Sequence, residues 1–190
     1  MTKAYLFLAT GFEEIEAIAT IDILRRGGVE LTTVSITGDL TVLGVHQIPV
    51  TADKLFEEVD FMDGDAFILP GGGPGSHNLN AHEALKKLLA CRNEKGKWIA
   101  AICAAPLVLG GLGLLEGKKA ICYPGIEPYL TGAIITDQPT VTDGNIITGK
   151  GPGFAFDFAL TILAALQGQE TADSVASDLL LALTAQPPIS

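Results

Sequence analysis

Short apolar runs alternate with segments of helical period along most of the chain. The pattern predicts strands over 4–9, 30–36, 66–69 and 97–102, and helices over 14–26 and 82–94. Runs such as AYLFLA and AFILP lack a polar face, which is typical of parallel strands covered by helices on both sides. We therefore expect one α/β domain over 1–190, a three-layer α/β/α sandwich with a mainly parallel central sheet.

Two segments, 41–53 and 140–149, break this alternation. In the second, Asp143-Gly144-Asn145 separates two β-branched runs as a hairpin turn does, so we expect small antiparallel additions at both places. Two further helices are predicted over 154–168 and 170–186, the first ending at a glycine and the second before two prolines. The first ten residues predict a strand rather than a signal peptide, because Gly-Phe-Glu-Glu follows at once.

Charge and cysteine content narrow the class of protein. The chain has a formal net charge of −10, which would repel a phosphate backbone or an anionic lipid surface, so we expect no nucleic-acid or membrane partner. No apolar run reaches the roughly 18 residues of a membrane span. The three cysteines, Cys91, Cys103 and Cys122, are too widely spaced for a disulfide framework or a paired metal site, which favours a reducing compartment, most simply the cytoplasm.

Cys103 lies where a predicted strand ends and a helix begins, in the segment WIAAICAAP. Ala104 and Ala105 permit a tight turn, and Pro106 suits a first helical turn because it has no N–H to leave unpaired. Ligands of open parallel sheets bind at this edge, and the positive end of a helix lowers a thiol pKa. Placement alone leaves a reactive thiol and a small buried hydrophobe equally open, whereas packing accounts better for Cys91 and Cys122.

The glycine-rich segment PGGGPG (70–75) also follows a predicted strand. It lacks the lysine of a phosphate-binding loop. Its backbone N–H groups could form half of an oxyanion hole, with the Ala104 amide as the other half. A tight turn that needs glycines for positive φ is an equally good interpretation.

A third segment at this edge, GFEEIE (11–16), places three carboxylates at the start of the first helix, where the helix dipole favours acidic residues. Glu16 differs from the other two because its helical neighbours carry little charge and can face the sheet. Burial there would raise its pKa, so that a protonated acid could donate to a thiolate. The choice among Glu13, Glu14 and Glu16 stays open on this reasoning.

Together, GFEEIE, PGGGPG, AAICAAP and GKGPGFAFDFAL resemble, in order and spacing, the ThiJ/PfpI superfamily, in the branch that contains YajL and the Parkinson's-disease protein deglycase. The resemblance covers nearly the whole chain. It implies a flavodoxin-like fold related to the class I glutamine amidotransferase domain, and a homodimer. It also implies that Cys103 is the nucleophile, Glu16 its protonated partner, and Gly72 and Ala104 the oxyanion amides.

The chain departs from the family at one position of the site. Many members carry a histidine where ICYPG has Tyr123, so a Cys-His peptidase dyad is not expected. His46, in GVHQIPV, aligns near a polar pocket position and could reach the site from its own loop or a dimer partner's. His77 and His82, after the glycines, are expected to be solvated or capping. No histidine follows His82, which excludes a glutamine amidotransferase.

A thiolate, a neutral carboxylic acid and two amides suit attack on a small, reactive carbonyl. The resemblance implies a stress-protective glyoxalase or protein deglycase that acts on methylglyoxal or its adducts, with no cofactor and no metal. The alternative is a non-catalytic redox sensor or oxidative-stress chaperone in which oxidation of Cys103 is itself the event.

Overall fold

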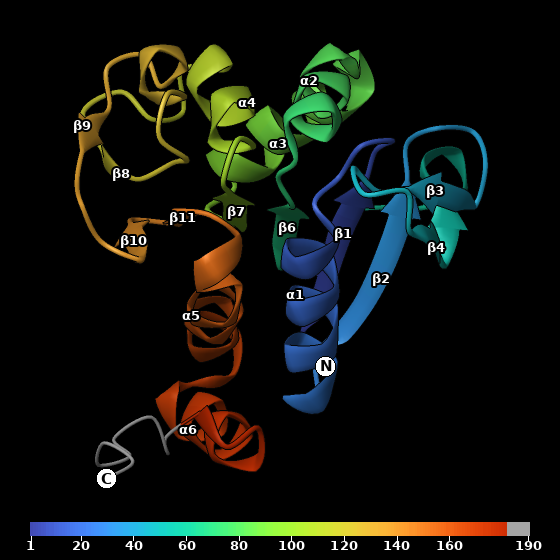
Figure 1. Cartoon of the computed structure of the whole chain (residues 1–190), viewed down its shortest axis with the longest axis vertical. Coiled ribbons are helices and arrows are strands. Elements are labelled where there is room, and N and C mark those ends of the chain that lie inside the picture. Colours follow the sequence, from blue (N-terminus) through green and yellow to red (C-terminus); the bar gives the residue numbers. More distant parts are fainter. Residues whose placement is uncertain (182–190) are drawn as a thin grey trace, which may run out of the picture.

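A seven-stranded sheet forms the centre of the computed structural model, which describes residues 1–181 (Figure 1). Neighbouring strands are parallel except for β10, which is antiparallel to β11 at one edge. This arrangement confirms the mainly parallel sheet. In spatial order the strands are β10 (Thr140–Asp143), β11 (Ile146–Gly149), β7 (Trp98–Ile102), β6 (Ala66–Leu69), β1 (Lys3–Leu8), β2 (Glu30–Ser35) and β5 (Lys54–Leu55).

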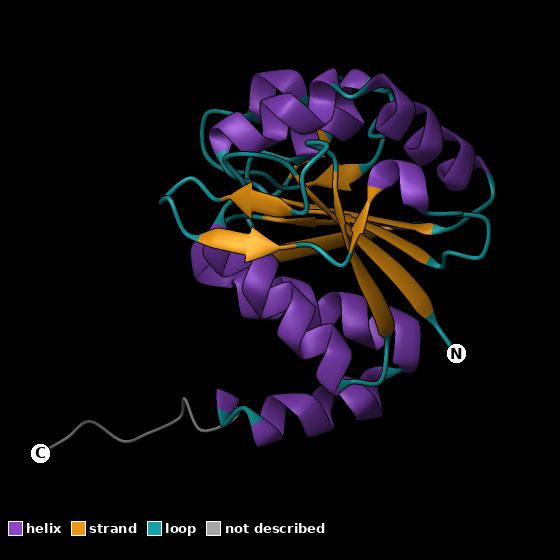
Figure 2. Cartoon of the chain, turned by 90° about the vertical axis from the view of Figure 1, so that its right-hand side faces the viewer, coloured by secondary structure: helices purple, strands orange, loops and turns teal. Residues whose placement is uncertain are grey.

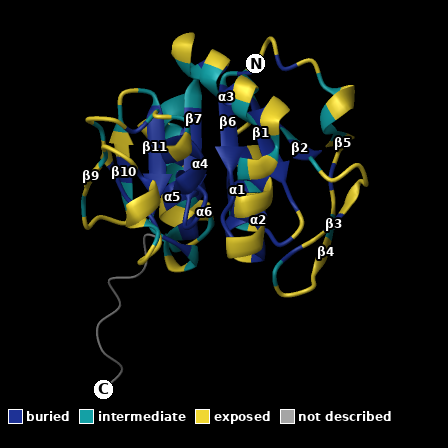
Figure 3. Cartoon of the chain, turned by 90° about the horizontal axis from the view of Figure 1, so that it is seen from above, coloured by how far each residue is buried: buried dark blue, intermediate teal, exposed yellow. Residues whose placement is uncertain are grey.

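Helices cover both faces of the sheet, as Figure 2 shows, which confirms the three-layer α/β architecture. On one face, α1 (Glu14–Arg26) packs against α5 (Ala155–Gln167), and α6 (Gln169–Asp178) follows against α5. The other face carries α2 (Gly73–Ala81), α3 (Glu83–Glu94) and α4 (Pro106–Gly111). Because both faces are covered, the central strands are buried almost throughout, and they form the dark core of Figure 3.

Both predicted antiparallel additions are confirmed. The first is a separate two-stranded sheet of β3 (Thr41–Leu43) and β4 (Pro49–Thr51). The second is the hairpin of β10 and β11, in which Gly144 of the connecting turn has φ +61°. The remaining short elements are β8 (Lys119–Ala120), which pairs with β9 (Ile134–Ile135), and the 3₁₀ helices η1 (Phe56–Glu58), η2 (Glu127–Tyr129) and η3 (Pro152–Phe154).

Two predicted boundaries were wrong. The glycine segment is not a loop throughout, because α2 begins at Gly73 and Pro74 occupies its first turn. The last predicted helix, 170–186, ends at Asp178 in the structure, where Leu180 has a positive φ of 61°. The part of that prediction beyond residue 181 lies outside the described residues. Among residues 1–181, none of the helices is both long and apolar enough to cross a bilayer.

Candidate active site

The order of the strands creates a topological switch point at the carboxyl edge of the sheet. Strands β1 and β6 are neighbours, but α1 leaves β1 on one face and α2 leaves β6 on the other (Figure 1). The connecting segments cross-link at this point, since Glu13 N–H donates to Gly71 O at 2.9 Å and Gly75 N–H donates to Gly11 O at 3.0 Å. The end of β7, where Cys103 lies, is next to β6. The three predicted segments therefore meet, as expected from the sequence.

Cys103 occupies a sharp turn between β7 and α4 with a φ of +64°. A residue with a Cβ atom adopts this left-handed conformation at a cost of about 1–2 kcal/mol. Backbone hydrogen bonds hold it there: Cys103 N–H donates to Gly149 O at 2.9 Å, and Tyr123 N–H donates to Cys103 O at 2.8 Å. The residue is only 8% exposed, so the thiol is largely shielded from bulk water.

The structure resolves the choice among the three glutamates in favour of Glu16 as the group beside the thiol. Its side chain is fully buried, and Oε2 accepts a hydrogen bond from Gly71 N–H at 2.8 Å. Oε1 has no hydrogen-bond partner in the described chain. Burial raises the pKa of Glu16 to about 7, although the Gly71 amide and the neighbouring Cys103 side chain lower it. The carboxyl therefore holds its proton to a higher pH than an exposed glutamate does.

The pKa of Cys103 differs from the sequence prediction. Burial, followed by the charge of Glu16, raises it to about 12, while the backbone amides of Gly72 and Ala104 lower it. The predicted lowering by a helix N-terminus fails because α4 has only six residues and the thiol is almost enclosed beside a carboxyl. With its pKa raised, the thiol retains its proton, and the carboxyl of Glu16 lies next to it.

Two backbone amides are available for an oxyanion. Gly72 has a φ of +88°, and a Cβ atom there would lie 2.3 Å from Gly11 O, so this position requires glycine. Neither Gly72 N–H nor Ala104 N–H donates to an oxygen of the described residues. Both amides instead act on the Cys103 sulfur. An oxygen that develops on a carbon bonded to this sulfur could accept hydrogen bonds from the same two amides.

Sequence reasoning missed Gly71, whose N–H orients Glu16, because the glycine run carries no sign of which amide binds a side chain. A Cβ atom on Gly71 would lie 2.6 Å from both Cys103 Cβ and Glu16 Oε2. We predict that Gly71→Ala lowers the free energy of unfolding by about 2–3 kcal/mol and impairs the site, because neither neighbour can move freely.

Urea denaturation and thiol reactivity measure this effect. Gly73→Ala is the matched control, since a Cβ atom there meets no atom within 4 Å and α2 begins at that residue. Equal stability of the two variants would contradict the prediction.

Tyr123 contacts Cys103 through its backbone rather than through its hydroxyl. Its N–H binds Cys103 O, and its ring lies against Gly151, where a Cβ atom would be 3.2 Å from Tyr123 Cδ2. The side chain is half exposed, and its hydroxyl makes no hydrogen bond to a described residue. Tyr123 therefore borders the site, and the structure gives its hydroxyl no contact with the thiol.

His46 does not reach the thiol within the chain. Its backbone N–H donates to Glu14 Oε1 at 2.7 Å, and its Nδ1 lies 3.0 Å from Glu14 Oε2. The bond to Glu14 raises the pKa of His46, and Glu13 raises it further. Glu13, Glu14 and His46 place ligand atoms within 4.8 Å of one another, as a cation site would. Because His46 already binds both carboxylate oxygens of Glu14, we assign no ion to this group.

The other cysteines and histidines make no recorded contact with the Cys103 side chain among residues 1–181. Cys122 is buried, and its burial raises its pKa to about 12, with a contribution from Glu127. Cys91 is exposed on α3 rather than packed. His82 is confirmed as a cap, since its Nδ1 accepts from Leu85 N–H at 3.1 Å at the start of α3. His77 is exposed on α2, in agreement with a solvated residue.

The fold and the site define the class of this protein. It is an α/β protein with a cysteine at a strand-to-helix turn and a buried carboxyl beside that cysteine. The profile of the DJ-1/PfpI family matches residues 2–165. The chain belongs to the DJ-1/PfpI family, which confirms the resemblance drawn from its four motifs.

Known relatives and solved structures agree with this assignment. Protein DJ-1 homolog A of Arabidopsis thaliana is 40% identical over 95% of this chain and 47% of its own length, so the chain spans about half of that relative. The glutathione-independent glyoxalase DJR-1.2 of Caenorhabditis elegans is 34% identical over 90% of this chain and 91% of the relative. The solved structure of oxidised Toxoplasma gondii DJ-1 is 35% identical, with a TM-score of 0.91 over 95% of this chain and 98% of that chain.

Proposed function

We propose that the chain is a cysteine-dependent glyoxalase or protein deglycase that acts on methylglyoxal or its adducts without a cofactor. The observation that carries this proposal is the buried carboxyl of Glu16, with a pKa of about 7, beside the Cys103 thiol and the two amides that face its sulfur. The name of the Caenorhabditis elegans relative supports the same chemistry. The free cysteines among the described residues suit a reducing compartment such as the cytoplasm.

The first step is addition of the thiol to the aldehyde carbon. Because the Cys103 pKa is raised, attack requires that the Glu16 carboxylate accept the thiol proton as the S–C bond forms. The carbonyl oxygen becomes an alkoxide, which the Gly72 and Ala104 amides stabilise. Proton return gives a hemithioacetal. A group with a pKa of about 7 can both accept and return a proton at neutral pH.

The later steps also use a single acid–base group. Glu16 removes the proton on C1 of the hemithioacetal and reprotonates C2, which converts the adduct into a thioester of Cys103. Water then hydrolyses the thioester, releasing lactate and restoring the thiol. The sum is methylglyoxal plus water giving lactate, with no change of redox state overall and no need for glutathione.

Methylglyoxal consumption and lactate release by the purified chain, without added thiol, test this proposal. Absence of turnover, or turnover that persists without Cys103, would contradict it.

A second candidate function is favoured by the oxidised state of the Toxoplasma gondii relative. In this second function, oxidation of Cys103 in the present chain would itself be the signal, as in a redox sensor or oxidative-stress chaperone. The near-complete burial and raised pKa of Cys103 favour the catalytic function instead, because peroxide reacts with exposed thiolates. The redox function requires no turnover of methylglyoxal, so the same assay separates the two.

We also infer that the chain forms a homodimer through α1 and the start of α5. Ile15, Ile18 and Phe156 are large apolar side chains exposed on one surface, and they line a depression of about 420 Å³ with Glu14, Ala19 and Asp22. A twofold contact brings the same surface of two copies together, so one apolar patch serves both. The family resemblance supports a second copy as the occupant.

We predict that Ile18→Glu weakens the dimer at least about 100-fold, since it buries an unpaired carboxylate in the contact. Sedimentation equilibrium measures the dissociation constant. Ile134→Glu is the control, because Ile134 is exposed to a similar extent but lies on β9, far from α1 (Figure 1). A monomeric parent chain, or an Ile18→Glu dimer of unchanged affinity, would contradict the inference.

A further inference from the structure

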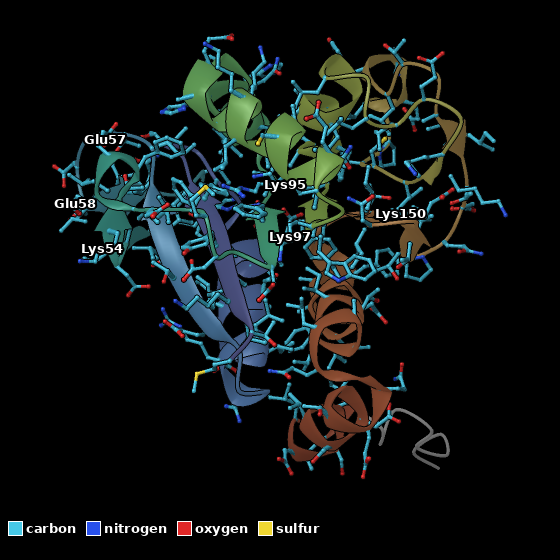
Figure 4. All side chains as sticks on the ribbon, turned by 180° about the vertical axis from the view of Figure 1, so that it is seen from behind. Lys54, Glu57, Glu58, Lys95, Lys97 and Lys150 are labelled. Atoms are coloured by element: carbon cyan, nitrogen blue, oxygen red, sulfur yellow. The ribbon has the colours of Figure 1, made fainter. Side chains whose placement is uncertain are left out.

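Arg92 is a buried cation with no ion-pair partner among residues 1–181. It lies on α3 and is 5% exposed, whereas the lysines and glutamates labelled in Figure 4 are exposed or half-buried. The other two arginines pair with Asp53 and Asp22, but Arg92 forms no ion pair with a described residue, although the chain has 22 acidic side chains. An unpaired buried guanidinium is costly, so its surroundings should contain an acceptor.

Among residues 1–181, the acceptor that the guanidinium contacts is a thioether. Arg92 Nη2 lies 3.0 Å from Met62 Sδ, while the buried Nε has no hydrogen-bond partner among residues 1–181. A thioether sulfur is a weak acceptor. Nε–H and Nη2–H point the same way along one edge of the guanidinium, so a stronger acceptor at the position of the sulfur could bind both.

Met62 is open to solvent on its other side. The residue is 62% exposed in the turn between η1 and β6, and its backbone N–H donates to Asp60 Oδ1 at 3.0 Å. Exposed methionines are oxidised by peroxide to sulfoxides, whose oxygen is a much better acceptor than the thioether. A sulfoxide on Met62 would thus supply the strong hydrogen-bond acceptor that the Nε–H and Nη2–H edge of Arg92 lacks.

We propose that Met62 is a peroxide-sensitive modification site whose oxidised form is stabilised by Arg92. Hydrogen peroxide transfers one oxygen atom to the sulfur: the O–O bond breaks, an S–O bond forms, the sulfur loses two electrons, and water leaves. The sulfoxide oxygen then accepts from Nε–H and Nη2–H of Arg92. Oxidation here strengthens a contact, whereas oxidation of a packed methionine usually disrupts one.

The contact between oxidised Met62 and Arg92 would fix the turn between η1 and β6, which also contains the core residue Phe61. Phe61 is next to Met62, and its ring packs against three other aromatic rings. The distances between ring centroids are 5.0 Å to Tyr5, 5.7 Å to Phe7 and 5.0 Å to Phe56. A sulfoxide held on α3 would pin this turn, and with it Phe61, to the helix. The oxidised protein should therefore unfold less readily than the reduced one.

The test compares urea unfolding of the full chain and of Met62→Leu, before and after hydrogen peroxide, with peptide mass spectrometry to confirm one added oxygen on Met62. We expect oxidation to lower the unfolding equilibrium constant of the parent chain about tenfold relative to the matched change in Met62→Leu. That control corrects for oxidation of Met1 and the cysteines. A Met62 that stays unoxidised, or whose oxidation leaves stability unchanged or lower, overturns the proposal.

Two further variants separate the hydrogen bond from other effects. Met62→Gln places an amide oxygen near the position of the sulfoxide oxygen, and should be more stable than Met62→Leu without any peroxide. Arg92→Lys keeps the charge but loses the paired N–H edge, so the gain on oxidation should disappear. If Met62→Gln is no more stable than Met62→Leu, the proposal fails even where Arg92→Lys does not fold.

Discussion

Replacing Cys103 with alanine should abolish the consumption of methylglyoxal, with kcat/KM reduced by about 10³-fold or more. Cys103 supplies the sulfur of the S–C bond on which every later step depends. Neither Glu16 nor the two amides can form that bond. Alanine still fits the turn, because the backbone bonds to Gly149 and Tyr123 do not involve the thiol. Lactate formation at saturating and limiting substrate gives kcat and kcat/KM.

Cys91→Ser is the matched control, since Cys91 is the exposed thiol of α3. It should keep full activity. If Cys91→Ser loses turnover and Cys103→Ala retains it, the nucleophile has been assigned to the wrong residue. Circular dichroism of each variant shows that the comparison is between folded proteins.

Replacing Glu16 with glutamine should reduce kcat by about 10²- to 10³-fold while leaving the fold intact. In the parent chain, kcat should rise with pH through about 7, as the Glu16 carboxylate becomes available to accept the thiol proton. The variant should lack this inflection. A pH profile that is unchanged in Glu16→Gln would contradict the role of Glu16 as the base.

The same substitution should make the protein more stable above neutral pH. The pKa of Glu16 is raised from 4.5 to about 7 in the folded chain, so between these values the unfolded chain releases a proton that the folded chain retains. Stability contributed by the protonated carboxyl is complete below pH 4.5 and is lost as pH rises through 7. The loss amounts to about 3 kcal/mol, from about 1.36 kcal/mol per pKa unit.

Glutamine cannot ionise, so urea unfolding of Glu16→Gln should show no such fall between pH 4.5 and pH 8. The parent chain should then be the less stable of the two at pH 8, despite being the active one. Parallel stability profiles of the two proteins would show that Glu16 is not perturbed by burial.

The parts of the fold that sequence predicts are those with a periodic apolar signal. The strand 66–69 is predicted by its continuous apolar run, which is typical of burial on both faces. The hairpin at Gly144 is predicted by the residues of its turn. Helix α2 was missed because glycine and proline are poor helix formers, and it is held by packing against the turn at Gly11. The two-residue strands β8 and β9 are too short to show any period.

The sequence likewise predicts some properties of the site and not others. Placement at the edge of the sheet brings Cys103, Glu16 and the amide of Gly72 together, because parallel strands end at one edge. The thiol pKa could not be predicted, since it depends on how completely tertiary packing encloses the sulfur and how near a carboxyl comes. The contact between His46 and Glu14 spans 32 positions and has no local signal.

The backbone around Cys103 also sets when reactivity can arise during synthesis. Its left-handed conformation is held by Tyr123 and Gly149, which leave the ribosome after it. At about 5–20 residues per second, a nascent chain exposes the cysteine some seconds before either partner exists. Until Gly149 has joined the sheet, the thiol has neither a fixed direction nor a base beside it. Before that point the thiol also lacks the burial that raises its pKa, so enclosure by the completed sheet is what suppresses its ionisation in the folded chain.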